Sequence, residues 1–89
     1  MATIQEEACR PTVIVVDDDA LVRQSLGSLL RSVDFAVLSF GSAQDLLEAE
    51  LPDVPACLVI DVRMPQIGGF ECHRQLLDRG LDVPAIFLT

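Results

Sequence analysis

Two short apolar runs, each closed abruptly by an aspartate, constrain the fold of this chain more than any other feature. Residues 13–16 and 57–60 are apolar throughout, and Asp17 and Asp61 follow them directly. Continuous β-branched runs of this length are typical of strands buried on both faces, as in parallel sheets. Each run is followed, after a turn, by apolar residues at helical spacing. The sequence therefore predicts an α/β fold built on a parallel sheet.

The full pattern alternates strands with helices. It predicts strands over 12–16, 35–40, 56–60 and 83–89, and helices over 19–32, from Ser42 to about Leu51, and over 70–79. Asp19 and Ser42 are expected to cap the first two helices, and Gly80 to end the third. Phe70, either His73 or Arg74, and Leu76 with Leu77 are expected on the inner side of that third helix. Right-handed crossovers would then place helices on both faces of the sheet.

Composition and charge exclude several classes of protein. Fourteen acids against six bases give a net charge of −8, which argues against direct binding of nucleic acid. Hydrophobic residues make up 51%, too many for a disordered tail, while apolar runs of four residues are far below the roughly twenty that a membrane span needs. The N-terminus carries no secretory signal pattern. Three cysteines without metal-site spacing indicate reduced thiols in a cytosolic protein.

The aspartates at the strand ends form the candidate site. In open parallel sheets, ligands bind outside the carboxyl ends of the strands. If the first and third strands are neighbours, Asp17, Asp18 and Asp61 converge there, and their mutual repulsion favours a bound cation. Carboxylates are hard ligands suited to Mg²⁺ or Ca²⁺. From the spacing alone, a metal site and a set of solvated helix caps remain alternative interpretations.

The motifs and their order resemble the receiver domain of bacterial two-component response regulators. The similarity rests on Val-Val-Asp-Asp-Asp at 15–19, Val-Arg-Gln-Ser-Leu at 22–26, Asp-Val-Arg-Met-Pro at 61–65 with Gly69, and Ile-Phe-Leu-Thr at 86–89. It covers residues 12–89, after a polar leader over 1–11. The motifs Asp-Val-Arg-Met-Pro and Ile-Phe-Leu-Thr are most similar to those of the FixJ-like group, whose receivers precede a LuxR-type helix-turn-helix. This resemblance implies a flavodoxin-like (CheY-like) doubly wound sheet of order 2-1-3-4-5.

The resemblance also implies roles for individual residues. Asp61 matches the phospho-accepting aspartate, Asp17 and Asp18 match the acidic pair that holds Mg²⁺, and the backbone carbonyl of Arg63 matches a further Mg²⁺ ligand. Thr89 matches the hydroxyl residue that bonds the phosphoryl oxygen. The implied partner is a sensor histidine kinase, and the implied parent protein is a cytoplasmic transcription regulator. Such a domain is not an enzyme beyond its own phosphotransfer and autodephosphorylation.

The sequence departs from the family pattern after Thr89. Receivers continue with a fourth helix, a fifth strand bearing a Lys and a fifth helix, whereas this sequence contains no Lys. We therefore expect a receiver shortened after the fourth strand, with DNA bound only through an output domain outside these residues. The apolar strand that includes Ile86 would become a sheet edge, through which we expect oligomerisation.

Two functions from different classes remain open. The first is a phospho-acceptor signalling module, favoured for the parent protein by Asp17, Asp18, Asp61 and Thr89. The second is an interaction or dimerisation module that keeps the receiver shape without phosphorylation, favoured for the isolated residues by the missing Lys-bearing strand. An aspartate-based phosphatase is a weak third interpretation. Those enzymes carry Asp-x-Asp after a strand, and here the residue two positions after Asp61 is Arg63.

Overall fold

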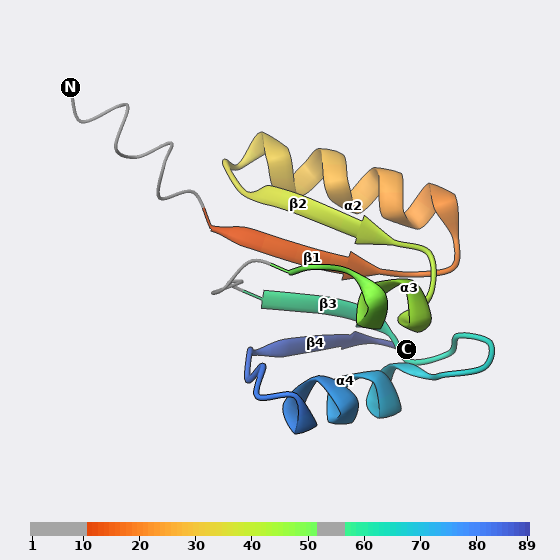
Figure 1. Ribbon diagram of the computed structural model, residues 1–89. Helices are drawn as coiled ribbons and strands as arrows, with labels where there is room; N and C mark the ends of the chain where they lie inside the picture. Colours follow the sequence, from red (N-terminus) through yellow and green to blue (C-terminus); the bar gives the residue numbers. More distant parts are fainter. Residues whose placement is uncertain (1–10, 52–56) are drawn as a thin grey trace.

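A four-stranded parallel sheet forms the centre of the computed structural model, which describes residues 11–51 and 57–89 (Figure 1). Along the chain the elements are β1 (Thr12–Val16), α2 (Ala20–Ser32), β2 (Ala36–Phe40), α3 (Ala43–Glu48), β3 (Cys57–Asp61), α4 (Gly69–Asp78) and β4 (Ala85–Leu88). The strand order β2-β1-β3-β4 confirms the first four positions of the predicted order. Most of the predicted leader, residues 1–10, and Ala56 of the predicted third strand lie outside the described residues.

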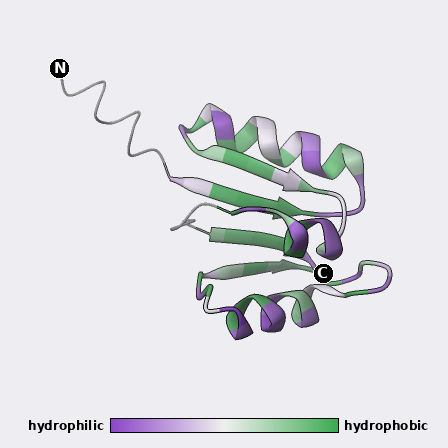
Figure 2. Cartoon of the chain, viewed as in Figure 1, coloured by the Kyte–Doolittle hydropathy of each residue, from purple (hydrophilic) through white to green (hydrophobic). Residues whose placement is uncertain are grey.

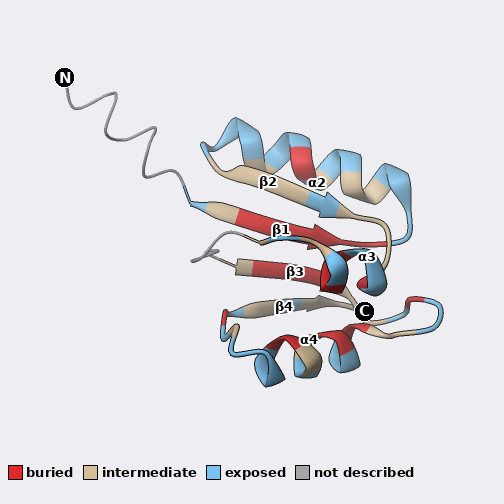
Figure 3. Ribbon diagram, viewed as in Figure 1, coloured by how far each residue is buried: buried red, intermediate tan, exposed pale blue. Residues whose placement is uncertain are grey.

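Strands β1 and β3 occupy the middle of the sheet and are its most buried elements (Figure 3). Their side chains alternate between two apolar clusters. Val13, Val15 and Val59 face α2, where Leu26 and Leu30 pack against them. The opposite face holds the larger cluster, formed with α3 and α4, whose fully buried members include Ile14, Val16, Leu46, Leu58, Ile60 and Cys72. Apolar colour runs along all the strands in Figure 2, as continuous rather than alternating apolar runs require.

The predicted capping residues lie at the expected helix ends, although α3 ends at Glu48 rather than near Leu51. Asp19 Oδ1 accepts the Leu21 N–H at 2.9 Å, and Ser42 Oγ accepts the Asp45 N–H at 3.1 Å. Gly80, with φ of 87°, lies just beyond the C-cap of α4. The longest described helix, α2, has 13 residues. In the described ranges we find no helix with the length and apolar character needed to cross a membrane.

The predicted inner side of α4 is partly wrong. Leu76 is buried, but Phe70 and Leu77 are 61% and 41% exposed. The buried face is instead made by Gly69, Cys72 and Leu76. Phe70 lies over the ring of Phe87 at a centroid distance of 4.6 Å, beside β4 rather than inside the core. Hydrophobicity at helical spacing indicated a helix but did not fix which apolar residues turn inward.

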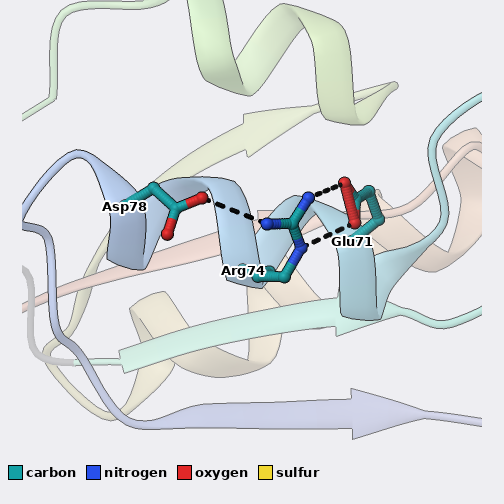
Figure 4. A network of polar contacts seen from close by, with 3 residues as sticks. All are labelled: Glu71, Arg74 and Asp78. Atoms are coloured by element: carbon teal, nitrogen blue, oxygen red, sulfur yellow. Dashed lines mark hydrogen bonds and ion pairs between the residues drawn. The ribbon is translucent and has the colours of Figure 1, made fainter.

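The exposed face of α4 carries a three-residue charge network (Figure 4). Arg74 contacts Glu71 one turn before it through Nε and Nη2, and Asp78 one turn after it through Nη1 at 3.2 Å. The Arg74 hydrogen bond lowers the pKa of Glu71, and the same contact raises the pKa of Arg74. All three side chains are solvent-exposed, so the network stabilises the helix only slightly.

Gly69 provides a test of how tightly α4 is fixed behind the β3 end. A Cβ atom at Gly69 would lie 2.5 Å from the backbone oxygen of Asp61, a contact that only backbone movement can relieve. We predict that Gly69→Ala lowers the free energy of unfolding by about 1–3 kcal/mol, as overpacking does. Urea denaturation followed by circular dichroism measures this change.

Gly27→Ala is the matched control for this prediction. Its Cβ would meet the flexible guanidinium of Arg31 at 3.1 Å, while alanine raises helix propensity by about 1 kcal/mol over glycine. We therefore expect Gly27→Ala to leave stability unchanged or to increase it. Equal losses in both variants would contradict the assigned close approach at Gly69.

Candidate metal centre at the carboxyl edge of the sheet

The parallel pairing of β1 with β3 brings the predicted aspartates together. Val16 pairs with Ile60 in the last register position, so Asp17 and Asp61 leave the two strands side by side. One carboxylate oxygen from each of Asp17, Asp18 and Asp61 lies within 4.8 Å of the others. Asp17 is 5% exposed, Asp61 is half-buried and Asp18 is exposed. The site thus has a buried floor and an open side toward solvent.

Local hydrogen bonds orient two of these carboxylates. The Asp19 N–H donates to Asp17 Oδ1 at 2.9 Å, and the Arg63 N–H donates to Asp61 Oδ1 at 2.9 Å. Both are bonds to a backbone N–H two residues further on, which aspartate side chains commonly form at turns. Each fixes one oxygen of its carboxylate, so the second oxygen remains available to a ligand.

The electrostatics of the site are unfavourable without a counter-ion. Burial raises the pKa of Asp17 most strongly, and the charges of Asp61, Asp18 and Asp19 raise it further, while the hydrogen bond from Asp19 opposes the shift. A carboxyl group with a raised pKa is destabilised in its charged form. A cation held among these oxygens would remove that destabilisation.

The donor set fits a hard divalent cation. All three side chains offer oxygen, and Mg²⁺ binds through one or two carboxylates while keeping several waters, which the open side of this site permits. The alternative interpretation, in which the aspartates are helix caps, applies to Asp19, which caps α2. Asp17 and Asp61 cap no described helix. The arrangement is therefore able to hold a cation and to present a carboxylate beside it.

Two further predicted site residues lie at the same edge. Leu88 pairs with Asp61, and its carbonyl accepts the Val62 N–H at 3.0 Å, so Thr89 follows β4 next to the β3 end. Arg63 is exposed, and its N–H bonds Asp61 as described. The contact of the Thr89 hydroxyl with a phosphoryl group and the coordination by the Arg63 carbonyl stay predictions.

Arg23 is a site neighbour that the sequence did not indicate. Its Nη1 donates to the backbone carbonyl of Asp17 at 2.6 Å, from the second turn of α2. Many surface arginines lie six residues from an aspartate, as Arg23 does from Asp17. The spacing alone therefore does not distinguish Arg23 from an arginine that has no contact with the site. The contact becomes visible only when α2 has been placed beside the end of β1.

We predict that Asp17→Asn stabilises the protein in the absence of divalent cations. Two unit charges about 4 Å apart repel by about 1 kcal/mol even in bulk water, so removing one charge from this site should raise the free energy of unfolding by at least about that amount at neutral pH. Since the folded-state pKa of Asp17 is raised, the wild type should lose stability as pH rises above the usual value of 3.8 and through the raised pKa. Thermal melts in a chelator across this range should show that loss in the wild type and a smaller one in Asp17→Asn.

Asp45→Asn is the matched control. It removes the same charge from the first turn of α3, where an acid interacts favourably with the helix dipole. Its stability in the chelator should not rise. A rise of similar size in both variants would indicate a general effect of net charge rather than repulsion within the site.

Comparisons with known proteins agree with this geometry. A protein-family model described as "Response regulator receiver domain" matches residues 13–89. The chain is 42% identical over 84 residues to nodulation protein W of Bradyrhizobium diazoefficiens, covering 94% of this chain and 37% of that protein. It is 45% identical over 78 residues to the transcriptional regulatory protein TdiR of Thauera aromatica, covering 88% and 34%. The chain thus spans about a third of the length of these relatives.

Solved structures give the same fold. The response regulator StyR superposes with a TM-score of 0.82 at 44% identity, over 89% of this chain and 40% of that one. The FixJ-N crystal structure superposes with a TM-score of 0.76 at 42% identity, over 86% and 62%. The residues matched by the family model, 13–89, include Asp17, Asp18 and Asp61.

Proposed function

The chain belongs to the response regulator receiver domain family, and we propose that its Asp61 accepts a phosphoryl group from the histidine of a partner sensor kinase. As a two-component receiver it is a signalling protein rather than a conventional enzyme. The observation that carries the proposal is the convergence of Asp17, Asp18 and Asp61 at the carboxyl edge of the sheet. Asp61 combines a partly open position with a carboxylate already oriented by the Arg63 N–H.

The proposed reaction transfers a phosphoryl group from a histidine nitrogen of the kinase to a carboxylate oxygen of Asp61. An oxygen of the Asp61 carboxylate forms a bond to phosphorus, and the bond from phosphorus to the histidine nitrogen of the kinase breaks, leaving its electron pair on that nitrogen. Positioning and charge neutralisation supply most of the acceleration in such transfers. The Arg63 N–H holds one Asp61 oxygen in place, so the other oxygen would attack the incoming group.

Mg²⁺ is the cation that we propose for the acidic site. Asp17, Asp18 and Asp61 would hold it with the Arg63 carbonyl, and their oxygens suit its preference for hard ligands. When bound, it would neutralise charge on the carboxylates and on the phosphoryl oxygens. The burial and raised pKa of Asp17 support a site that is completed by a cation.

The proposal extends to the protein that contains these residues. One relative is named a transcriptional regulatory protein, as is FixJ of Azorhizobium caulinodans at 44% identity. By analogy we propose that phosphorylation of Asp61 controls transcription in the cytoplasm, with DNA bound by an output domain outside residues 12–89. Thr89 would report phosphorylation by moving its hydroxyl to a phosphoryl oxygen. These roles rest on the family and on the position of Thr89 at the β4 end.

Incubation with acetyl phosphate tests the nucleophile. We predict that the parent protein, which contains these residues, gains one phosphoryl group when Mg²⁺ is present and none in a chelator. Intact-protein mass spectrometry measures this gain. Asp61→Asn keeps the size of the side chain but removes the nucleophilic oxygen, so it should gain no phosphoryl group. Uptake by Asp61→Asn at the wild-type rate would show that another residue is the acceptor.

Asp19→Asn is the matched control for Asp61→Asn. Asparagine caps a helix about as well as aspartate, so α2 should keep its N-terminal end. The variant removes one negative charge close to the site while leaving Asp17, Asp18 and Asp61 intact. Phosphorylation near the wild-type rate is expected. A complete loss of labelling would mean that the acceptor assignment rests on charge near the site rather than on Asp61 itself.

A second candidate function, an interaction module that needs no phosphorylation, is favoured by the outer side of β4. In the described sheet β4 pairs only with β3, and its residues carry no charge. Ile86 is 55% exposed, and Phe70 lies beside Phe87 on the other face. An uncharged edge strand is a template for pairing with another chain. We propose that the 89-residue chain by itself associates through β4.

Analytical ultracentrifugation of the 89-residue chain tests this association. We predict dimers or larger species at low micromolar concentration, and a shift toward monomer in Ile86→Lys, because lysine on an edge strand opposes strand pairing. Leu29→Lys, which alters a similarly exposed apolar residue on α2, should leave the distribution unchanged. A compact wild-type monomer would refute association through β4.

A further inference from the structure

Arg23 reaches from α2 back to the base of the acidic site. Its Nη1 donates a hydrogen bond of 2.6 Å to the backbone carbonyl of Asp17, the most buried of the three converging aspartates. Helical side chains lean toward the N-terminus of their helix, which directs this long side chain toward the end of β1. The contact therefore joins the second turn of α2 to the first residue of the site.

The position of this charge calls for an explanation. A cation near the N-terminus of a helix lies at the unfavourable end of the helix dipole, and the acids at this end precede α2, with Asp19 as its N-cap and none in its first turn. Within the described residues, the only side-chain ion pairs are those of Arg74 with Glu71 and Asp78. Arg23 thus forms no ion pair with a described residue, and its identified partner is the carbonyl oxygen of Asp17.

The carbonyl of Asp17 lies at the point where the sheet ladder stops. Register pairs of β1 end at Val16 on both of its sides, although the Asp17 N–H still bonds the Phe40 carbonyl at 3.2 Å. Arg23 supplies a donor for the Asp17 carbonyl, and the Asp19 N–H supplies one for its carboxylate. With its N–H, carbonyl and side chain all bonded, Asp17 is fixed in position and in direction.

Gly41 provides the space for this contact. It directly follows β2, and a Cβ atom there would lie 3.3 Å from Arg23 Nη1, closer than side chains ordinarily pack. Its φ is not positive, so the backbone conformation itself does not require glycine. Three elements therefore meet at the guanidinium: α2, the end of β1 and the turn after β2.

We propose that Arg23 is a positioning residue of the acidic site, which acts through the Asp17 carbonyl to hold Asp17 and Asp18 in the arrangement that accepts a divalent cation. This inference rests on the proposed function, because it assumes that the site binds Mg²⁺. The proposal also distinguishes two effects of Arg23 that change Mg²⁺ affinity in opposite directions. The positive charge of Arg23 disfavours a nearby cation, whereas the order that it imposes on the ligands favours one.

The sign of the change in Mg²⁺ affinity distinguishes these effects. We expect Arg23→Gln to weaken Mg²⁺ binding by about tenfold, the lower end of the range seen when the support of a metal ligand is removed. If charge alone mattered, Arg23→Gln would bind Mg²⁺ more tightly than the wild type. Titration with MgCl₂ at constant ionic strength, followed by the backbone amide resonances of residues 17–19, measures the dissociation constant without relying on phosphorylation.

Arg31→Gln is the matched control for charge. Arg31 is on the same helix two turns later, where its guanidinium lies over Gly27, and no described hydrogen bond joins it to the site. Its replacement removes the same charge and should leave Mg²⁺ affinity unchanged or slightly tighter. Arg23→Lys keeps the charge and one N–H donor, so it should recover part of the affinity lost in Arg23→Gln.

Gly41→Ala tests the same contact in a chain that keeps Arg23, and it decides the matter if Arg23→Gln does not fold. Its methyl group should displace the guanidinium and weaken Mg²⁺ binding, by less than Arg23→Gln does. If Arg23→Gln binds Mg²⁺ as tightly as the wild type or more tightly, the positioning role of Arg23 is overturned, while the metal site itself stands. If Arg23→Gln does not fold, the same result in Gly41→Ala has the same meaning. If the wild type binds no Mg²⁺, the metal site of the proposed function is overturned together with this inference.

Discussion

The repulsion among three aspartates at one sheet edge is the constraint on which the rest of this structure depends. Parallel pairing of β1 with β3 forces Asp17 and Asp61 together, and burial makes the charge on Asp17 more costly still. The apolar clusters on both faces of these strands hold the two strand ends in register regardless of that repulsion. The hydrophobic core therefore maintains an arrangement that the acidic side chains oppose, and a bound cation would relieve that repulsion.

Backbone groups do much of the work of shaping the site. Asp17 and Asp61 each accept an N–H from two residues further on, and the Val62 N–H ties the β3 end to the Leu88 carbonyl of β4. Such bonds depend on the path of the chain rather than on side-chain identity. Gly69 adds a steric condition, since any larger residue would collide with the Asp61 carbonyl. The acidic side chains supply the chemistry, while the surrounding backbone sets their direction.

The sequence predicted the strands and the helix caps because each depends on local pattern, and it predicted the convergence of the three acids on the condition that the first and third strands are neighbours. The buried runs of β1 and β3 are continuous, and Asp19 and Ser42 cap the helices that they precede. It placed Phe70 and Leu77 wrongly, since which apolar residues of α4 turn inward depends on how the helix sits against the sheet. It could not predict the Arg23 contact either, because that contact requires α2, β1 and Gly41 to be in place together.

The loop after β3 is closed at its base by a backbone bond, from the Gly69 N–H to the Val62 carbonyl at 3.1 Å. Inside that closure Met64 is buried, whereas Pro65 and Gln66 are exposed and Gln66 has φ of 69°. Each doubling of loop length costs only about 0.6 kcal/mol in closure entropy. The tip of this loop can therefore lengthen or accept a foreign segment while the base keeps Asp61 in place, so the surface next to Asp61 can diversify independently of the acidic site.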